Sequence, residues 1–253
     1  MNGPADVVLL HGVGLDHAMW ERVAPGIGAR HRVHAPDLRG HGTAPNATPG
    51  TTLADLAGDV ADLVAGLPGP AHVVGFSLGA LVATELALDH PGLVASLTLV
   101  SGVANRSPDE RAAVASRLRA ARADLDATYL AAVERWFSPR WRAAEPELPE
   151  RVLATLRANR RESYLACYAV FATADAELWP RLPGLHLPVH AITGSDDPGS
   201  TPAMAAALAA RVPCGRSTVV PGARHLLPLE RPAEVVDAVL AQVDEYSRGA
   251  LRS

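Results

Sequence analysis

The chain has 253 residues, of which 48% are hydrophobic and 20% are charged, and its formal net charge is -4 at pH 7. This composition is typical of a soluble globular protein, and the lack of a basic field argues against nucleic acid as a partner. No apolar run approaches the roughly 20 residues that span a bilayer, and the first residues lack the pattern of a signal peptide. We therefore expect a cytoplasmic protein with no membrane partner.

The residues that commonly hold metals or nucleotides do not form a pattern. The two cysteines, Cys167 and Cys214, give neither a disulfide framework nor a zinc spacing, and Cys167 lies in an apolar helical stretch typical of the core. No histidine or acidic pair has metal-ligand spacing. Gly12-x-Gly14 lacks the third glycine and the downstream acid of a dinucleotide site. We expect no metal and no cofactor.

Aliphatic runs and helical patterns alternate along the first hundred residues. Strands are predicted at 7–10, 32–36, 72–74 and 97–100, and helices at 53–64 and 81–88. Residues 15–29 are predicted to form a loop and an amphipathic helix. Such alternation with short links indicates a parallel sheet covered by helices on both faces.

The alternation stops between residues 105 and 181. Helical patterns recur there at 109–124, 130–137, 150–161 and 163–173, separated by prolines and without a convincing strand. We interpret this segment as an inserted helical cap. Most of its arginines belong on solvated helix faces, although one or two could meet an anionic substrate.

The alternation then resumes. Strands are predicted at 189–193 and 217–220, and helices at 202–210 and 232–246. The predicted fold class is α/β, with a mainly parallel sheet of about six strands flanked by helices. The sheet domain would comprise residues 1–104 and 182–253, and the cap residues 105–181.

The stretch Gly75-Phe76-Ser77-Leu78-Gly79 matches the G-x-S-x-G pattern of a nucleophile elbow, between a predicted strand and a predicted helix. An elbow forces its serine into a strained backbone conformation, and side chains two residues away on either side would collide with the turn. The following helix directs its N-terminus at the serine, which favours developing negative charge. Ser77 is therefore a candidate nucleophile.

Candidate partners for Ser77 also follow predicted strands. In an open parallel sheet, reactive groups gather beyond the carboxyl ends of the strands. Asp197 lies three residues after Gly194 at one such end, and His225 lies at another. The order serine, aspartate, histidine is that of one large class of hydrolases. Asp196 remains the alternative carboxylate.

Short sequence motifs that are typical of one protein family occur along nearly the whole chain. They are His11-Gly12, Met19-Trp20, Asp37-Leu38-Arg39-Gly40-His41-Gly42, the elbow, Gly194-x-x-Asp197, Gly222-Ala-Arg-His225 and Glu230-Arg-Pro232, with Arg135-Trp136-Phe137, Pro139 and Tyr164-x-x-Cys167 in the cap. On these residues the chain resembles α/β-hydrolases of the cap-bearing esterase and lactonase branch, and most of all 3-oxoadipate enol-lactonase-like proteins.

Acyl transfer gives each candidate residue a role. Ser77 attacks the substrate carbonyl while His225 takes its proton, and Asp197 fixes the histidine tautomer and stabilises the imidazolium. The backbone N–H groups of Val13 and Leu78 would form the oxyanion hole. The predicted function is cofactor-free hydrolysis of a small ester or lactone through an acyl-enzyme.

Four further residues are candidates for the substrate pocket. His11 and Gly12 border the cleft by position, although His11 could instead shape the loop through its hydrogen bonds. Trp136 and Tyr164 could line the pocket beneath the cap, and packing within the cap is the alternative. The expected partner is a small-molecule substrate.

Two departures from the resembled family stand out. The few residues before Val7 leave no room for an amino-terminal antiparallel hairpin, so a sheet edge must be covered in another way, for example by a second subunit in a homo-oligomer. In addition, Val170-Phe-Ala-Thr-Ala174 is uncharged where the enol-lactonase-like group tends to carry a basic residue. A dicarboxylate lactone would lack that partner.

The same triad serves other functions. A carbon–carbon bond hydrolase or a perhydrolase would keep all of these residues. So would a ligand receptor on a hydrolase scaffold, in which slow hydrolysis serves signalling. Substrate panels separate the first two from an esterase, and sustained turnover argues against the third.

Overall fold

The computed structural model describes residues 3–250, and its centre is one sheet of six parallel strands. The strands are β1 (Asp6–Leu10), β2 (Arg32–His34), β3 (Ala71–Phe76), β4 (Val94–Val100), β5 (Val189–Gly194) and β6 (Gly215–Val220). They lie in the order β2-β1-β3-β4-β5-β6, and every neighbouring pair is parallel. The prediction of about six parallel strands is confirmed.

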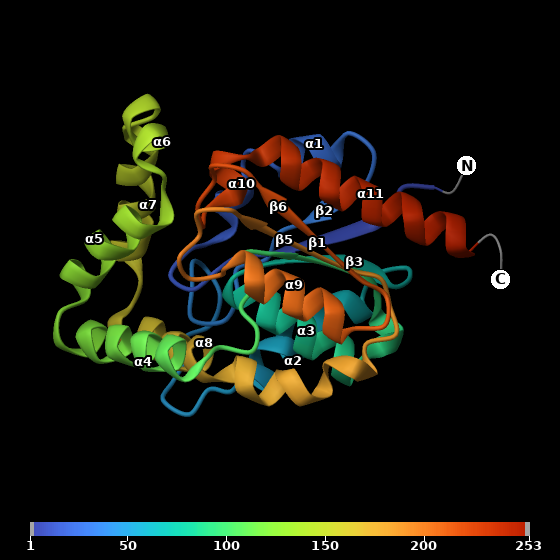
Figure 1. Ribbon diagram of the computed structural model, residues 1–253. Helices are drawn as coiled ribbons and strands as arrows, with labels where there is room; N and C mark the ends of the chain where they lie inside the picture. The colour runs from blue at the N-terminus through green and yellow to red at the C-terminus, as the bar shows by residue number, and fades with distance from the viewer. Residues whose placement is uncertain (1–2, 251–253) are drawn as a thin grey trace.

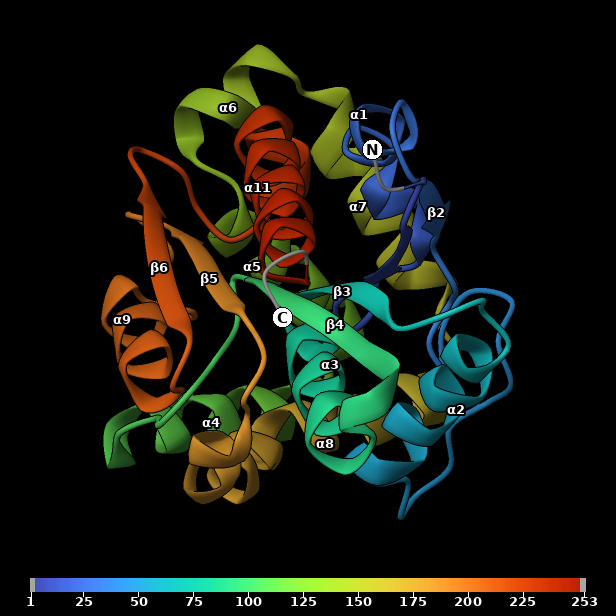
Figure 2. The ribbon, with the colours of Figure 1, turned by 90° about the vertical axis from the view of Figure 1, so that its right-hand side faces the viewer.

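Helices cover both faces of the sheet. One face carries α1 (Ala24–Gly28) and α11 (Pro232–Ala250), and the other carries α2 (Leu53–Ala65), α3 (Leu78–Asp89) and α9 (Pro202–Arg211), as Figures 1 and 2 show. The remaining short helices of this part are η1 (His17–Trp20), η2 (Pro91–Leu93) and α10 (Leu227–Glu230). This three-layer arrangement brings the carboxyl ends of the strands to one edge of the sheet.

Residues 105–181 contain consecutive helices and no strand. These are α4 (Pro108–Ala123), α5 (Leu125–Trp136), α6 (Pro139–Ala144), α7 (Glu147–Ala158) and α8 (Arg161–Leu178), followed by η3 (Trp179–Gly184). In Figure 1, α4 to α7 lie to one side of the sheet. We keep the name cap for residues 105–181, and its assignment as a separate domain stays a prediction.

Local hydrogen bonds fix where two of these helices begin. Thr52 accepts a hydrogen bond from the backbone N–H of Asp55, whose carboxylate accepts one from the backbone N–H of Thr52. Ser107 and Glu110 make the same reciprocal pair at the start of α4. Each pair satisfies N–H groups that have no partner inside the helix.

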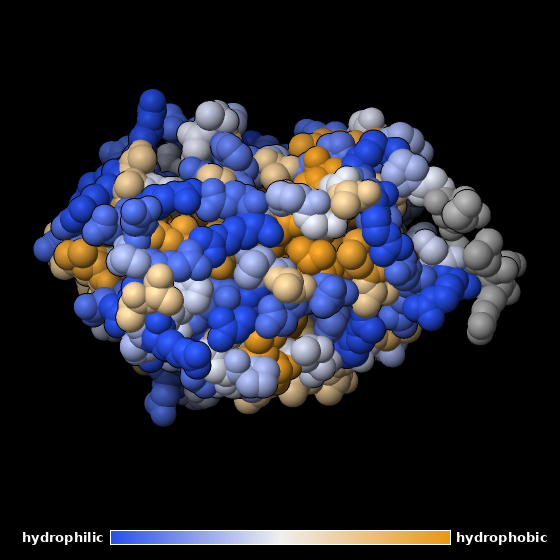
Figure 3. Space-filling view, turned by 90° about the horizontal axis from the view of Figure 1, so that it is seen from above, coloured by the Kyte–Doolittle hydropathy of each residue, from blue (hydrophilic) through white to orange (hydrophobic). Residues whose placement is uncertain are grey.

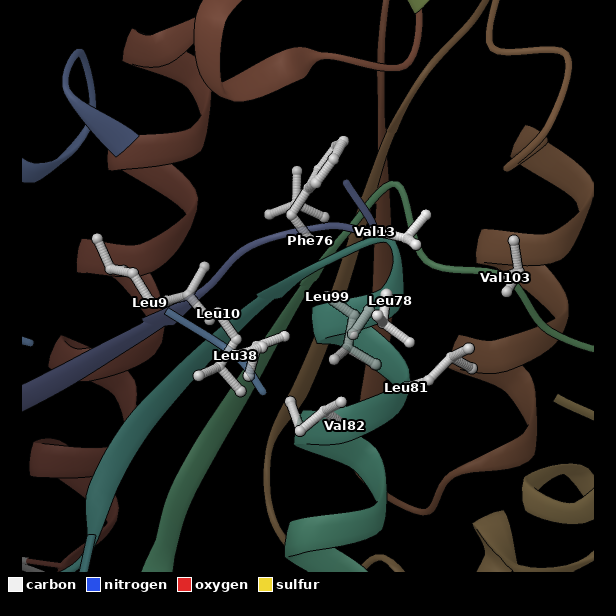
Figure 4. Packing of buried hydrophobic residues seen from close by; sticks show 14 of the residues in the cluster. Leu9, Leu10, Val13, Leu38, Phe76, Leu78, Leu81, Val82, Leu99 and Val103 are labelled. Atoms are coloured by element: carbon white, nitrogen blue, oxygen red, sulfur yellow. The ribbon is translucent and has the colours of Figure 1, made fainter. Parts of the chain in front are cut away.

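The core lies on both sides of the four central strands. β1, β3, β4 and β5 are buried along their whole length, as expected for parallel strands between two helical layers. Figure 4 shows buried hydrophobic residues of β1, β3, β4 and α3 around the turn from β3 into α3. Cys167 is buried in α8, and burial raises the pKa of its thiol to about 12. It is a core residue, as its apolar surroundings in the sequence indicate.

The edge strand β2 is short and charged. Arg32 donates two hydrogen bonds to the carboxylate of Asp6 on β1, at 2.8 and 2.6 Å, and His34 lies 2.9 Å from the same carboxylate. The bonds from Arg32 lead the contacts that lower the pKa of Asp6 to about 2. A three-residue charged strand is a poor template for further pairing. The homo-oligomer expected at this edge stays a prediction.

Large hydrophobic side chains are exposed at only a few scattered positions among the residues whose exposure is described. In Figure 3, which views the molecule from the side of α1 and α11, hydrophilic and hydrophobic residues are interspersed. Among residues whose exposure is described, the large exposed hydrophobic residues are Leu130, Val219 and Tyr246, on three different elements. Between residues 3 and 250, no helix combines the length and the apolarity needed to cross a membrane.

Candidate active site

Ser77 occupies a sharp turn between the end of β3 and the start of α3. Its φ is 53° and its ψ is -108°, a conformation that side-chain-bearing residues rarely adopt. A Cβ at Gly75 would lie 2.2 Å from the carbonyl oxygen of Gly79, and a Cβ at Gly79 would lie 2.2 Å from that of Leu10. Only glycine fits at both positions, so these two residues permit the turn that holds the Ser77 hydroxyl above the sheet.

Ser77, His225 and Asp197 are in contact in series. The Oγ of Ser77 lies 3.3 Å from Nε2 of His225, and Nδ1 of His225 lies 2.7 Å from Oδ2 of Asp197. All three side chains are buried. With Nδ1–H donating to the carboxylate, Nε2 is left as the acceptor for the serine proton, which is the tautomer that a general base needs.

The two neighbouring aspartates have different surroundings. Oδ1 of Asp197 accepts hydrogen bonds from the backbone N–H groups of Gly199 and Ser200, at 2.8 and 2.9 Å, which orients Oδ2 toward His225. Asp196 is exposed, and its carboxylate accepts a hydrogen bond from Ser195. The geometry therefore favours Asp197 over Asp196 as the partner of the histidine.

Two backbone N–H groups near Ser77 have no acceptor within the described part of the chain. Leu78 is the first residue of α3, so its N–H has no intrahelical partner. Val13 borders the same cavity as Ser77, and no acceptor is found for its N–H between residues 3 and 250. These are the two donors that the sequence predicts for the oxyanion hole, and that role stays a prediction.

A cavity lies above the candidate triad, between the sheet and the cap. Its empty space, with the open mouth included, is about 540 Å³. Trp136, Tyr164 and Phe171 of the cap line it together with Ser77 and His225. Two of the four predicted pocket residues, Trp136 and Tyr164, are thus brought together with the serine.

Comparison with known proteins identifies the family. Residues 7–238 match the sequence model of the alpha/beta hydrolase family. The chain belongs to the α/β-hydrolase family. It is 31% identical over 242 residues to a pimeloyl-[acyl-carrier protein] methyl ester esterase of Aeromonas hydrophila, covering 94% of each chain.

Lactonases are also among its relatives. This hydrolase is 28% identical over 242 residues to 3-oxoadipate enol-lactonase 1 of Acinetobacter baylyi, covering 93% of this chain and 88% of the relative. Its fold superimposes on the crystal structure of the enol-lactonase from Burkholderia xenovorans with a TM-score of 0.87 at 26% identity, covering 96% of this chain and 92% of that chain. The resemblance read from the motifs is confirmed.

His11 and Gly12 of this hydrolase are not among the residues that line the cavity. His11 is fully buried, its Nδ1 lies 2.9 Å from the carbonyl oxygen of Gly12, and its Nε2 accepts a hydrogen bond from the backbone N–H of Leu38 at 2.8 Å. Both ring nitrogens are therefore occupied in shaping the loop. A Cβ at Gly12 would lie 2.7 Å from the ring of Phe76, so this glycine allows the loop to pass close to the elbow.

Burial of His11 makes the stability of the fold depend on pH. Burial disfavours the charged ring and lowers the pKa of His11 from 6.5 to about 4. The unfolded chain therefore binds a proton at a higher pH than the folded chain, so this contribution is complete above about pH 6.5 and is lost as the pH falls toward 4. From pH 7 to pH 5 the loss from this residue is about 2 kcal/mol.

Urea unfolding across this pH range is the measurement. We expect His11→Asn to be less stable than the parent near neutral pH, because it loses the bond from Leu38, and to lose less further stability on acidification. The ring of His41 lies 5.0 Å from that of His11, and burial lowers the pKa of His41 to about 3. His41 should therefore keep part of the pH dependence of the unfolding free energy in the variant. If the unfolding free energies of the parent and the variant changed equally between pH 7 and pH 5, His11 would not be a source of the pH dependence.

Sequence reasoning did not identify the contacts that hold the histidine loop. The backbone N–H groups of His225 and Leu226 both donate to the carbonyl oxygen of Trp136 at the end of α5, at 3.1 and 3.3 Å. Ser101, with a positive φ of 47°, donates its hydroxyl to the carbonyl oxygen of His225 at 2.8 Å. The candidate base is thus attached to the cap on one side and to the end of β4 on the other.

Glu230 extends this attachment. Its buried carboxylate accepts hydrogen bonds from the hydroxyl of Ser138, between α5 and α6, and from the backbone N–H of Arg224. The motif Glu230-Arg-Pro232 marks this position in the sequence, but nothing in the motif indicates Ser138 as the partner.

Two arginines of the cap also line the cavity. Arg117 of α4 and Arg135 of α5 border it together with Ser77. The sequence predicts that one or two cap arginines could meet an anion, but it does not distinguish these two from the others.

Proposed function

We propose that this protein is a serine hydrolase that cleaves small esters or lactones through an acyl-enzyme on Ser77, without a cofactor. The observation that carries the proposal is the series of contacts from Ser77 to His225 and from His225 to Asp197, at 3.3 and 2.7 Å. The relatives named as a methyl ester esterase and an enol-lactonase support the bond type.

The proposed reaction has two halves. Ser77 Oγ attacks the carbonyl carbon as its proton passes to Nε2 of His225, and the carbonyl oxygen becomes an oxyanion facing the N–H groups of Val13 and Leu78. The bond to the leaving alcohol breaks, and His225 gives its proton to that oxygen. In a lactone, the alcohol stays attached to the acyl chain. Water then attacks the acyl-enzyme, and His225 takes a proton from the water and returns it to Ser77.

Covalent labelling tests the nucleophile directly. A fluorophosphonate should phosphonylate this protein once, with loss of fluoride, and peptide mass spectrometry should locate the label on Ser77. The Ser77→Ala variant should remain unlabelled under the same conditions. A label on another residue, or an equal label on the variant, would contradict the proposal.

Product analysis then distinguishes hydrolysis from the other reactions of such a triad. We expect many turnovers per molecule on short-chain esters and lactones, with the acid and the alcohol as products. A single turnover would favour a receptor, and products formed only from a carbon–carbon substrate or from peroxide would favour the other enzyme classes.

A further inference from the structure

The cavity above Ser77 has a cationic side without a counter-ion. Arg117 and Arg135 border it, and neither forms an ion pair within residues 3–250. Within the same residues, the Arg135 side chain donates one hydrogen bond, from Nη1 to the carbonyl oxygen of Ala131 on its own helix, at 3.4 Å. Most of the donors of its guanidinium are therefore free for a ligand.

The other charged groups of the cavity do not neutralise these arginines. Asp197 is the acidic residue that lines it, and its two oxygens are already bound by His225, Gly199 and Ser200. Apart from Asp197 and the two arginines, the titratable groups that line the cavity are the hydroxyls of Tyr164 and Tyr168 and the imidazole of His225.

The surroundings of Arg135 favour an added negative charge. Burial, followed by the nearby charge of Arg117, lowers the pKa of Arg135 below its usual value. Two like charges in a half-buried cavity repel each other and are poorly solvated. An anion between them would relieve both effects, because a carboxylate accepts hydrogen bonds from guanidinium groups in a planar geometry.

The position of Arg135 connects this charge to the reaction. The next residue, Trp136, presents its ring 5.9 Å from the ring of His225 and accepts the backbone hydrogen bond of the same histidine. Arg135 itself lines the same cavity as Ser77 and His225, so a molecule that places an anion at Arg135 occupies the cavity that the candidate triad borders. Phe171 adds an apolar wall to the same cavity.

We infer that Arg117 and Arg135 bind a free carboxylate of the substrate, so that the substrate class is a small ester or lactone that carries a second, ionised carboxyl group. The inference rests on the proposed function, since it deepens the specificity of the same site. It is also compatible with the uncharged segment at residues 170–174, because the arginines that would bind the carboxylate lie on α4 and α5 and not in that segment.

Paired substrates that differ only in charge test the inference. The anionic substrate is monomethyl glutarate, and the neutral one is the monoamide of the same half-ester. We expect kcat/KM for the anion to exceed that for the amide by about 10- to 100-fold, the usual range for charge-assisted hydrogen bonds. The Arg117→Met/Arg135→Met double variant should bring this ratio near one, whereas the double lysine variant should retain part of it.

Arg119→Met is the matched control. Arg119 is exposed on α4 and is not among the residues that line the cavity, so the ratio should stay at the parent value. Thermal unfolding of each variant verifies that it is folded. A parent that prefers the amide, or a double variant that keeps the full ratio, would overturn the inference while leaving the hydrolase proposal intact.

A binding measurement tests the carboxylate site even if the proposed hydrolase function is wrong. Calorimetric titration of Ser77→Ala with monomethyl glutarate needs no turnover, and the Kd should rise about tenfold or more when both arginines are methionine. Arginine-dependent binding by a protein that hydrolyses no ester would contradict the proposed function and support the carboxylate site. Equal affinity for the half-ester and its amide would overturn the carboxylate site.

Discussion

Ser77→Ala is expected to reduce kcat for a short-chain activated ester by about 10⁴-fold or more, as removal of the nucleophile does in triad hydrolases. The reason is local. Alanine keeps the backbone of the turn but offers no oxygen to the carbonyl, so His225 has no proton to accept. Initial rates, corrected for hydrolysis in buffer alone, measure the effect, and thermal unfolding checks that the variant is folded.

The matched control is Ser217→Ala. Ser217 is exposed on β6, away from the carboxyl edge of the sheet, and its side chain makes no hydrogen bond within residues 3–250. Its activity should stay within about twofold of the parent, as surface substitutions usually do. Substantial turnover by Ser77→Ala would show that another group performs the chemistry.

Much of the sheet and of its flanking helices could be predicted, because the sequence signals for these elements are local. A buried parallel strand reads as an aliphatic run of limited length, and the elbow must carry glycine where the backbone passes 2.2 Å from a would-be Cβ. The side chains that follow strands converge because the topology brings the strand ends together. Ser77, Asp197 and His225 could therefore be named before their distances were known.

The arrangement of the cap was harder to predict from the sequence, because its specific contacts join residues that are far apart in the chain. Arg106 and Asp175 form a buried ion pair, at 2.6 Å, between the start of the cap and α8. α6 lies within a stretch where the prolines predicted only breaks, yet Ser138 caps it and also binds Glu230. Which arginines face the cavity depends on how α4 and α5 pack, and helical periodicity within each helix does not specify that packing.

Asp197→Asn should lower kcat by about 10⁴-fold, the size of effect that this exchange has in a serine protease triad. The hydrogen bonds from Gly199 and Ser200 hold one oxygen of Asp197, and the amide oxygen of asparagine can accept both of them. The amide nitrogen then faces Nδ1 of His225 as a donor. This contact favours the tautomer that carries its proton on Nε2, which cannot take the proton of Ser77.

Asp196→Asn provides the comparison, because it makes the same change on the adjacent, exposed residue. Its kcat should remain within about twofold of the parent, the range common for exposed positions. Both variants should unfold near the parent temperature, since neither removes a core side chain. If Asp196→Asn were the inactive protein and Asp197→Asn retained most of its activity, the carboxylate in contact with His225 would not be the one that supports the base. The hydrogen-bond argument for Asp197 would then fail together with the tautomer that it assigns.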